Sequence, residues 1–291
     1  MSGSRSILAL LTLLLASLVG PGPLSADFSV NLGRGSVTVQ VPSSYDSSVP
    51  APLILLLHGY GSTGAAIDLY LRLSSLSEQH GFLYAAPDGL QNSTGSQYWN
   101  ATDYCCGFGS SVDDSGYLKD LIDAIKAEAN IDAKRVYVFG HSNGGFMAHR
   151  MACDHSDSIA AIVSLAGATY KDFSDCSPSG PVNVLQIHGR LDDTIRFSGS
   201  SGFRRYPGAI ETARDWAGSN NCRGPVRRGP DIDLDLFIVG LDTRRWGVPT
   251  SQCDPGGGVQ LWIIPEGEHV PTPSLSFNDQ IVAYLLGHPK P

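Results

Sequence analysis

Apolar and polar positions follow two different patterns along the chain. Residues 28–31 and 36–41 alternate apolar with polar side chains around Gly33 to Gly35, which predicts a β-hairpin. Later segments are short runs of consecutive apolar residues, a pattern typical of strands buried on both faces of a sheet. These runs occupy residues 53–57, 82–86, 136–139, 159–165, 182–187 and 259–264.

Helix-like segments separate several of these apolar runs. The clearest covers residues 116–129 and follows Asp113 and Asp114, whose carboxylates can cap free amides and oppose the helix dipole. One face of this segment repeats apolar residues at positions i, i+3, i+4 and i+7, namely Leu118, Leu121, Ile122 and Ile125. The alternation predicts an α/β fold, with a mostly parallel sheet flanked by helices on both faces.

Composition narrows the class of protein. Of 291 residues, 42% are hydrophobic and only 16% charged, which suits a globular chain with a sizeable core. The net charge of −8 provides no basic field for nucleic acid or anionic membranes, so uncharged substrates fit better. We find no internal repeat and no Ser/Thr/Pro-rich linker, and interpret the Gly/Pro/Arg-rich residues 220–230 as a surface excursion within one domain.

The N-terminus has the pattern of a secretory signal peptide. Arg5 supplies a positive charge, residues 7–19 an apolar segment, and Leu24-Ser25-Ala26 a small-residue cleavage site. The apolar run is shorter than the ~20 residues that span a bilayer, which argues against a retained membrane anchor. We therefore expect a signal peptide over residues 1–26 and a single catalytic domain over residues 27–291, exported to the extracellular space or the periplasm.

The six cysteines are consistent with export, because an even number in an oxidising compartment predicts three disulfides. Their spacing contains no C-x-x-C motif, so we expect no metal site. A bond between the adjacent Cys105 and Cys106 would be strained, and each is expected to reach a distant partner. The predicted pairing joins Cys222 to Cys253 and leaves Cys105 and Cys106 for Cys153 and Cys176.

The strongest chemical signal is the G-x-S-x-G motif of residues 140–144. The pattern alone is weak evidence in a chain rich in Gly and Ser, but here it follows an apolar strand and precedes a helical stretch over residues 145–153. That strand-turn-helix context is the one a nucleophile elbow requires. The motif therefore predicts Ser142 as a nucleophile, with flanking glycines where a tight turn leaves no room for Cβ atoms.

A serine nucleophile needs a histidine base, which in turn needs an acid. Around such an elbow the chain order is Ser, acid, His, which leaves two of the eight histidines as candidates for the base. His288 follows the last predicted helix near the C-terminus, whereas His269 follows a strand, so His269 is the predicted base. The acid is Asp192 or Asp193, which follow the strand over residues 182–187; Glu266 and Glu268 are too close to His269 in sequence to orient it.

Backbone amides are expected to stabilise the developing oxyanion. One is the amide after the nucleophile, from Asn143, and the other comes from the loop after an early strand. We assign the second to Tyr60 in preference to Gly61. His58 and His188 each begin a His-Gly pair at a strand end and are interpreted as structural residues.

Trp99 lies in a polar loop before the paired cysteines. An aromatic residue in such a loop is more often a packing residue than a substrate platform. A disulfide from Cys105 or Cys106 to Cys153 would fasten this loop beside the nucleophile's helix, and Trp99 would then line the acyl pocket. Trp99 is therefore the predicted substrate-binding residue.

Together these motifs resemble, in order, the polyhydroxybutyrate depolymerase and feruloyl esterase group of secreted α/β-hydrolases. The matching segments are His58-Gly59-Tyr60-Gly61, Tyr98-Trp99-Asn100, Cys105-Cys106 with Val112-Asp113-Asp114, Gly140 to Gly145, His188-Gly189-x-x-Asp192, and Gly267-Glu268-His269. In that family the aspartate at the fifth position of H-G-x-x-D is the acid, so the resemblance selects Asp192. It also implies a calcium-independent, cofactor-free hydrolase acting on ester bonds.

The resemblance implies a secreted serine carboxylic-ester hydrolase. Its expected substrates are hydroxycinnamoyl-polysaccharide esters or polyester oligomers such as polyhydroxyalkanoates, with a short-chain acetyl esterase as the alternative. Many relatives carry Trp shortly after the catalytic histidine, whereas Val270 follows it here, and no linker or surface-binding module is found, which favours soluble or short esters. A serine peptidase or an inert secreted binding protein are the remaining alternatives, distinguished by matched anilide substrates and by fluorophosphonate labelling.

Overall fold

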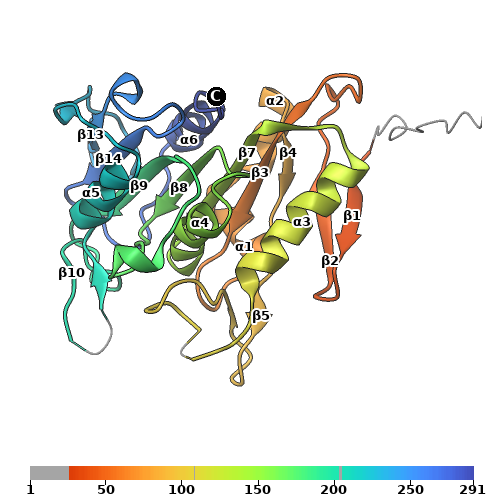
Figure 1. Ribbon diagram of the computed structural model, residues 1–291, viewed down its shortest axis with the longest axis horizontal. Helices are drawn as coiled ribbons and strands as arrows, with labels where there is room; N and C mark the ends of the chain where they lie inside the picture. Colours follow the sequence, from red (N-terminus) through yellow and green to blue (C-terminus); the bar gives the residue numbers. More distant parts are fainter. Residues whose placement is uncertain (1–25, 108, 203–204) are drawn as a thin grey trace, which may run out of the picture.

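The computed structural model describes residues 26–107, 109–202 and 205–291. Within these ranges ten strands form one sheet, in which the six central strands run parallel and the strands at both edges run antiparallel (Figure 1). Their order across the sheet is β1 (Phe28–Asn31), β2 (Ser36–Gln40), β4 (Leu83–Ala85), β3 (Ala51–Leu57), β7 (Ile131–His141), β8 (Ala161–Leu165), β9 (Asn183–Gly189), β14 (Val259–Ile264), β13 (Arg244–Val248) and β12 (Arg227–Arg228).

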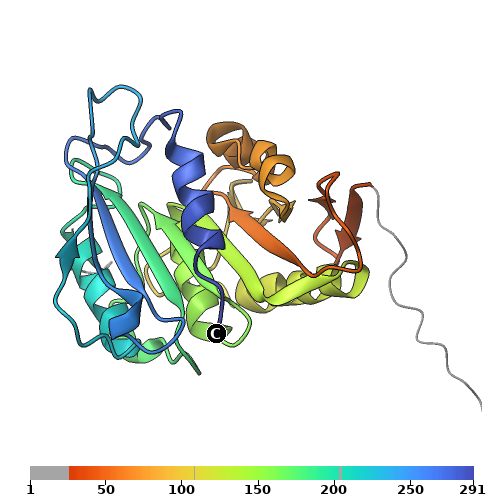
Figure 2. The ribbon, with the colours of Figure 1, turned by 90° about the horizontal axis from the view of Figure 1, so that it is seen from above.

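Helices cover both faces of this sheet, as Figure 2 shows from above. α3 (Asp114–Glu128), α4 (Asn143–Asp154) and α5 (Ala209–Ser219) pack on one face, and α1 (Gly64–Leu71), α2 (Ser74–His80) and α6 (Phe277–Leu286) on the other. Successive side chains of β3 enter the two cores in turn, Leu55 on the α3 side and Leu56 on the α6 side. This two-sided burial explains why the central strands read as continuous apolar runs.

The pattern-based predictions of the fold are confirmed. β1 and β2 pair as an antiparallel hairpin, each of the six apolar runs contains a strand, and the predicted helix forms as α3. The Asp113 side chain accepts a hydrogen bond of 2.8 Å from the Gly116 amide, which is the expected cap. The mostly parallel sheet flanked by helices on both faces is therefore present as predicted.

The antiparallel strands β13 and β12, which lie beyond β14, were not predicted from the sequence. Residues 220–230 do run over the surface, but they end in the edge strand β12, which pairs with β13. Short two-residue strands pair elsewhere: β5 (Leu90–Gln91) with β6 (Gln97–Tyr98), and β10 (Gly199–Ser200) with β11 (Tyr206–Pro207). Single 3₁₀ turns occur at η1 (Phe173–Asp175) and η2 (Thr250–Gln252).

The disulfide pairing corrects one prediction and confirms another. Cys222 bonds Cys253 as predicted. Cys105 bonds the adjacent Cys106, however, and Cys153 bonds Cys176. The expectation of distant partners for Cys105 and Cys106 was therefore wrong: the Cα atoms of the two bonded residues lie 3.0 Å apart.

The predicted signal peptide lies outside the described residues except for Ala26, and the single-domain assignment stays a prediction. None of the helices within the described ranges is both long and apolar enough to cross a membrane.

Candidate active site

Ser142 occupies the turn between β7 and α4. Its φ of 55° and ψ of −120° lie in a region that residues with side chains rarely adopt. Two glycines make the turn possible: a Cβ at Gly140 would come within 2.0 Å of the Gly144 carbonyl oxygen, and a Cβ at Gly144 within 2.2 Å of the Leu57 carbonyl oxygen. The motif thus has its predicted strand-turn-helix setting, at the carboxyl end of β7.

Two further side chains meet Ser142 at this edge of the sheet. The His269 Nε2 atom lies 2.9 Å from Ser142 Oγ, and His269 Nδ1 lies 2.8 Å from Asp192 Oδ2. A proton on Nδ1 satisfies Asp192 and leaves Nε2 free to accept from Ser142. Asp192 follows β9 and His269 follows β14, and these strands are parallel neighbours. The loops after them therefore leave the same edge and bring the three residues together.

Four hydrogen-bond donors surround Asp192. Its Oδ1 accepts from the amides of Thr194 (3.0 Å) and Ile195 (2.7 Å), and its Oδ2 lies beside His269 and 3.3 Å from His188 Nε2. Burial alone would raise the pKa of this fully buried carboxyl. The hydrogen bonds from His188, His269 and Ile195 outweigh burial and hold the pKa of Asp192 well below its usual range. Asp192 is therefore a fixed negative charge behind His269.

Asp193, the alternative acid, faces solvent. Its side-chain contact is to the Thr194 hydroxyl at 3.4 Å, and the residue is exposed. The geometry accordingly places Asp192 against His269 and Asp193 away from it, which matches the choice drawn from the family resemblance.

A buried chain of hydrogen bonds supports Asp192 from behind. It begins at Trp216 Nε1, which donates to His149 Nδ1 at 3.0 Å, and passes from His149 Nε2 to Gln186 Oε1 at 2.9 Å. Gln186 Nε2 then donates to His188 Nδ1 at 3.1 Å, which leaves the proton of His188 on Nε2, where it is donated to the Ile195 carbonyl oxygen at 2.7 Å with Asp192 Oδ2 at 3.3 Å. Burial lowers the pKa of His149 to about 4, so its ring is neutral and holds one tautomer at neutral pH.

This series of hydrogen bonds was not predicted from the sequence, because His188 was interpreted as a purely structural residue. His188 is buried, as that interpretation implies, but one of its neighbours is the carboxylate of the proposed acid. The only sequence signal was the His-Gly pair at the end of a strand. Its partners, Gln186 two residues away and His149 on another element, give no motif.

His141, the residue before Ser142, holds the backbone of His269. Its Nε2 lies 2.9 Å from the His269 carbonyl oxygen, and the two rings are 5.1 Å apart. Burial is the main cause that lowers the pKa of His141 to about 4, so the ring stays neutral and donates this hydrogen bond. Tyr70 fixes the next turn of the same loop, since its hydroxyl donates to the Pro271 carbonyl oxygen.

The two amides assigned to the oxyanion belong to Asn143, which follows Ser142 in the chain, and to the loop of Tyr60. Asn143 is the first residue of α4, where the amide has no partner within the helix. The loop with Tyr60 lies against the nucleophile, because a Cβ at Gly59 would be 3.3 Å from the Ser142 Cβ. The Gly61 amide donates to the Gln97 carbonyl oxygen at 2.8 Å, which leaves Tyr60 as the available donor of the pair.

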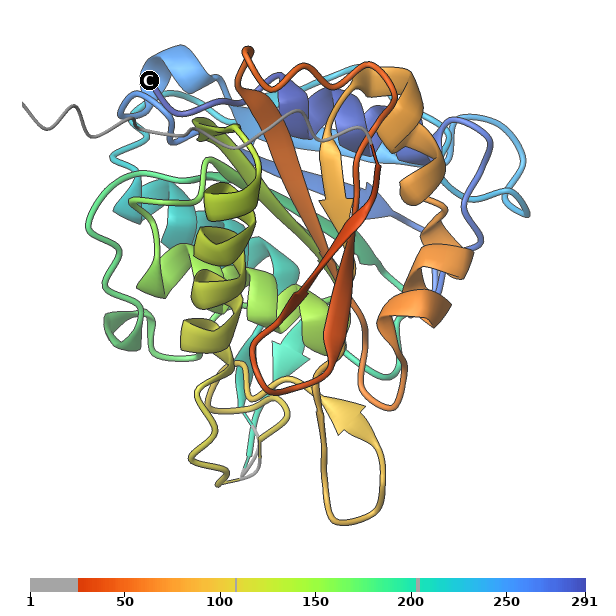
Figure 3. The same cartoon turned by 90° about the vertical axis from the view of Figure 1, so that its right-hand side faces the viewer.

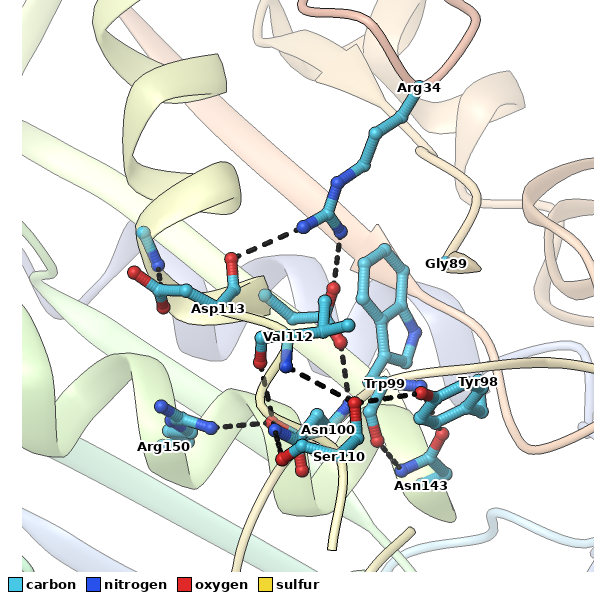
Figure 4. A network of polar contacts seen from close by, with 12 residues as sticks. Arg34, Gly89, Tyr98, Trp99, Asn100, Ser110, Val112, Asp113, Asn143 and Arg150 are labelled. Carbon is cyan, nitrogen blue, oxygen red and sulfur yellow. Dashed lines mark hydrogen bonds and ion pairs between the residues drawn. The ribbon is translucent and has the colours of Figure 1, made fainter. Parts of the chain in front are cut away.

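The loop that carries Trp99 is fastened by a network of polar contacts (Figure 4). Asn143 clasps its backbone: the Trp99 amide donates to Asn143 Oδ1 at 2.7 Å, and Asn143 Nδ2 donates to the Trp99 carbonyl oxygen at 2.8 Å. Asn100 donates to the carbonyl oxygens of Ser110 and Val112, and Arg150 of α4 donates to the Asn100 carbonyl oxygen at 2.6 Å. Side chains of the nucleophile's own helix therefore position this loop.

The position of Trp99 contradicts its predicted role as a substrate-binding residue. Its side chain is fully buried, and its Nε1 donates to the His58 carbonyl oxygen at 3.1 Å. The condition for a role in the acyl pocket, a disulfide from this loop to Cys153, is also not met, because Cys153 bonds Cys176. Trp99 packs beneath the loop of His58 and Tyr60 and has no surface with which to contact a substrate.

We expect the side chain of Asn143 to stabilise the fold, independently of the role proposed for its backbone amide. Asn143→Ala would leave the buried amide of Trp99 without a partner and its carbonyl oxygen with only the Cys106 amide at 3.2 Å, so the free energy of unfolding in urea should fall by about 1–3 kcal/mol. Asn31→Ala is the matched control, because Asn31 also accepts from a backbone amide, that of Gly33, but at the surface. It should cost less than about 1 kcal/mol. Equal losses of unfolding free energy in the two variants would contradict a stabilising role for the hydrogen bonds between the Asn143 side chain and the Trp99 backbone.

The described residues offer no metal centre: no group of three or more His, Cys, Asp or Glu side chains among them is arranged to hold an ion.

Comparison with known proteins assigns the chain to a family. The family model described as alpha/beta hydrolase fold matches residues 52–217, more than half of the chain. The chain belongs to the α/β hydrolase fold family. Figure 3 shows its sheet from the side of β1 and β2.

Individual relatives of this α/β hydrolase are esterases and depolymerases by name. Feruloyl esterase B of Piromyces equi is 28% identical over 76% of this chain and 42% of its own length. Poly(3-hydroxyalkanoate) depolymerase C of Paucimonas lemoignei is 29% identical over 75% of this chain and 51% of its own. The acetyl xylan esterase structure from Aspergillus awamori shares the fold with a TM-score of 0.65 and 15% identity, covering 89% of this chain and 98% of that one. The chain spans about half the length of the two curated relatives.

Proposed function

We propose that this α/β hydrolase is a secreted serine carboxylic-ester hydrolase that works through an acyl-enzyme. The observation that carries the proposal is the aligned set of Ser142, His269 and Asp192, with hydrogen-bond distances of 2.9 and 2.8 Å. The names of the relatives support ester substrates. Three disulfides and the predicted signal peptide support export.

In the first step His269 takes the proton of Ser142, and Oγ attacks the ester carbonyl carbon. The C=O electron pair moves to oxygen, where the amides of Tyr60 and Asn143 stabilise it. Collapse breaks the bond to the alcohol, which leaves with the proton from His269. Water then gives a proton to His269 as its oxygen attacks the acyl carbon; the bond from that carbon to Ser142 Oγ breaks, His269 returns the proton to Oγ, and the acid leaves. Asp192 stabilises the imidazolium in both steps.

Hydrolysis assays and covalent labelling of the wild-type protein test whether it cleaves esters with a serine nucleophile. We expect hydrolysis of p-nitrophenyl butyrate, little turnover of the matched butyryl p-nitroanilide, and labelling by a fluorophosphonate. Methyl ferulate and a hydroxybutyrate oligomer, compared by kcat/KM, separate the hydroxycinnamoyl and polyester substrate classes. A protein that neither reacts with the fluorophosphonate nor cleaves any ester of this set would contradict the proposal and favour an inert binding protein.

A further inference from the structure

A groove of about 520 Å³ lies between α5 and the antiparallel edge of the sheet. α5 packs on β9 and β14 (Figure 1), and the lining beside it comes from β14 and β13. Leu261 and Ile263 of β14, together with Trp246 and Val248 of β13, give the groove an apolar lining. This lining includes none of the proposed catalytic residues, so the groove is a separate feature, and its volume suits a small molecule.

One end of the groove is positively charged. Arg190 directly follows β9, Arg244 begins β13 opposite the carboxyl end of β14, and Arg214 lines the groove from α5. We call these three residues the arginine trio. At the other end, Val248 of β13 pairs with Val259, the first residue of β14. The groove therefore runs from a cationic end to an apolar end.

Within the described residues the arginine trio has no paired carboxylate, because none of its side chains forms an ion pair or a hydrogen bond there. Glu211 of α5 pairs with Lys171 at 2.6 Å instead, and Asp215, four residues on, lies on the same side of the helix. Arg244 also borders a neighbouring cavity with Glu266, but no ion pair joins these two residues. In a chain with a net charge of −8, such a trio around one groove indicates an anionic ligand.

We propose that the groove binds a monocarboxylate with an aliphatic tail, its carboxylate on the arginine trio and its tail along β14 toward Val248. Guanidinium groups match a carboxylate with two parallel hydrogen bonds each. From Val259 to Ile263 the strand advances by about 13 Å, which is room for a chain of medium length. Burial of the tail against the apolar lining supplies the rest of the affinity. The inference goes beyond the proposed function and does not depend on ester cleavage.

Other occupants satisfy only part of the groove. A neutral apolar molecule would leave the arginine trio without a counter-charge, and a small anion such as acetate would leave the apolar lining in water. The first described residues of the chain lie at β1, at the opposite edge of the sheet from β13 and β12, so they are not placed to fill it. An amphipathic carboxylate satisfies both ends.

The charge requirement is tested by calorimetric titration of the wild-type protein with octanoate, octanol and acetate. We expect octanoate to bind, and both octanol and acetate to bind more weakly by about tenfold or more, because each lacks one half of the ligand. Arg214→Gln combined with Arg244→Gln should weaken octanoate binding by about tenfold or more. The control, Arg72→Gln with Arg227→Gln, makes the same change of net charge at two exposed arginines outside the groove and should have less than about a twofold effect.

The apolar end is tested by a second pair of variants. Val226 lines the groove there, since it precedes Arg227, whose partner across the strands is Gly247 of β13. Val226→Glu places a charge where the tail lies and should weaken octanoate binding by about tenfold or more. Val49→Glu is the matched control outside the groove, because Val49 is 56% and Val226 63% exposed. Urea unfolding checks that both variants keep the fold.

No detectable binding of octanoate, or equal binding by the groove variants and their controls, would overturn the inference. Octyl phosphate that binds about ten times more tightly than octanoate would identify a phosphate ligand, and a dimer that Val226→Glu converts to monomer in sedimentation velocity would identify a second copy as the occupant; both overturn it. Groove-dependent binding of octanoate by a protein that cleaves no ester would support the groove and reject the proposed function, because the two sites share no residue.

Discussion

Ser142→Ala should lower kcat for p-nitrophenyl butyrate by about 10⁴-fold or more, while the unfolding transition in urea stays within about 1 kcal/mol of the wild type. The substitution removes the Oγ that lies 2.9 Å from His269 Nε2 and leaves the turn otherwise intact. Alanine retains a Cβ in the same backbone conformation, so the unusual φ of 55° is no harder to adopt than with serine. The measurement is the steady-state rate, corrected for trace wild-type protein by fluorophosphonate titration.

A substitution at a second serine shows whether the loss of activity is specific to Ser142 or follows from the loss of any serine hydroxyl. Ser219→Ala, at the exposed end of α5, should keep full activity and full fluorophosphonate labelling. Retained labelling in Ser142→Ala would show that a different side chain is the reactive nucleophile. Retained turnover together with lost labelling would show that ester cleavage does not pass through Ser142.

The sequence predicts the central strands and the β1–β2 hairpin of this fold, but not the strands β13 and β12 at the other edge of the sheet. The buried parallel strands can be recognised in the sequence because both of their faces pack against helices. This burial requires consecutive apolar residues, such as those of β3. β13 was missed because four of its five residues are exposed or half-buried and its sequence, Arg-Arg-Trp-Gly-Val, contains no apolar run. A strand that buries so little apolar surface gives little sequence signal of its pairing.

The proposed catalytic residues were also predictable, because the Ser-acid-His order constrains positions along the chain. Their supporting contacts were not. Asn143 clasps Trp99 across 44 residues of sequence, and His188 reaches Asp192 through a turn whose shape depends on two backbone amides. Trp99 shows the consequence: an aromatic residue in a polar loop gives no sign of its burial until the partners that bury it are placed.

Asp192→Asn should lower kcat by about 10⁴-fold, although the two side chains have nearly the same shape. The reason lies in the donors that surround the group. Oδ1 of Asp192 accepts from the amides of Thr194 and Ile195, so an asparagine must place its own oxygen there and its NH₂ at the position of Oδ2. That NH₂ would then face His269 Nδ1 as a donor, and His269 would carry its proton on Nε2, where it cannot accept from Ser142.

The neighbouring residue supplies the control. Asp193→Asn makes the same change one position away at a solvent-facing side chain, so kcat and kcat/KM should stay within about twofold of the wild type. The two variants also separate catalysis from binding, because a lost tautomer lowers kcat while KM for a soluble ester changes little. If Asp193→Asn gave the larger loss, the acid would be Asp193, and the loop after β9 would have to rearrange during turnover. Similar, small losses in both variants would instead show that His269 keeps its working tautomer without a carboxylate at position 192.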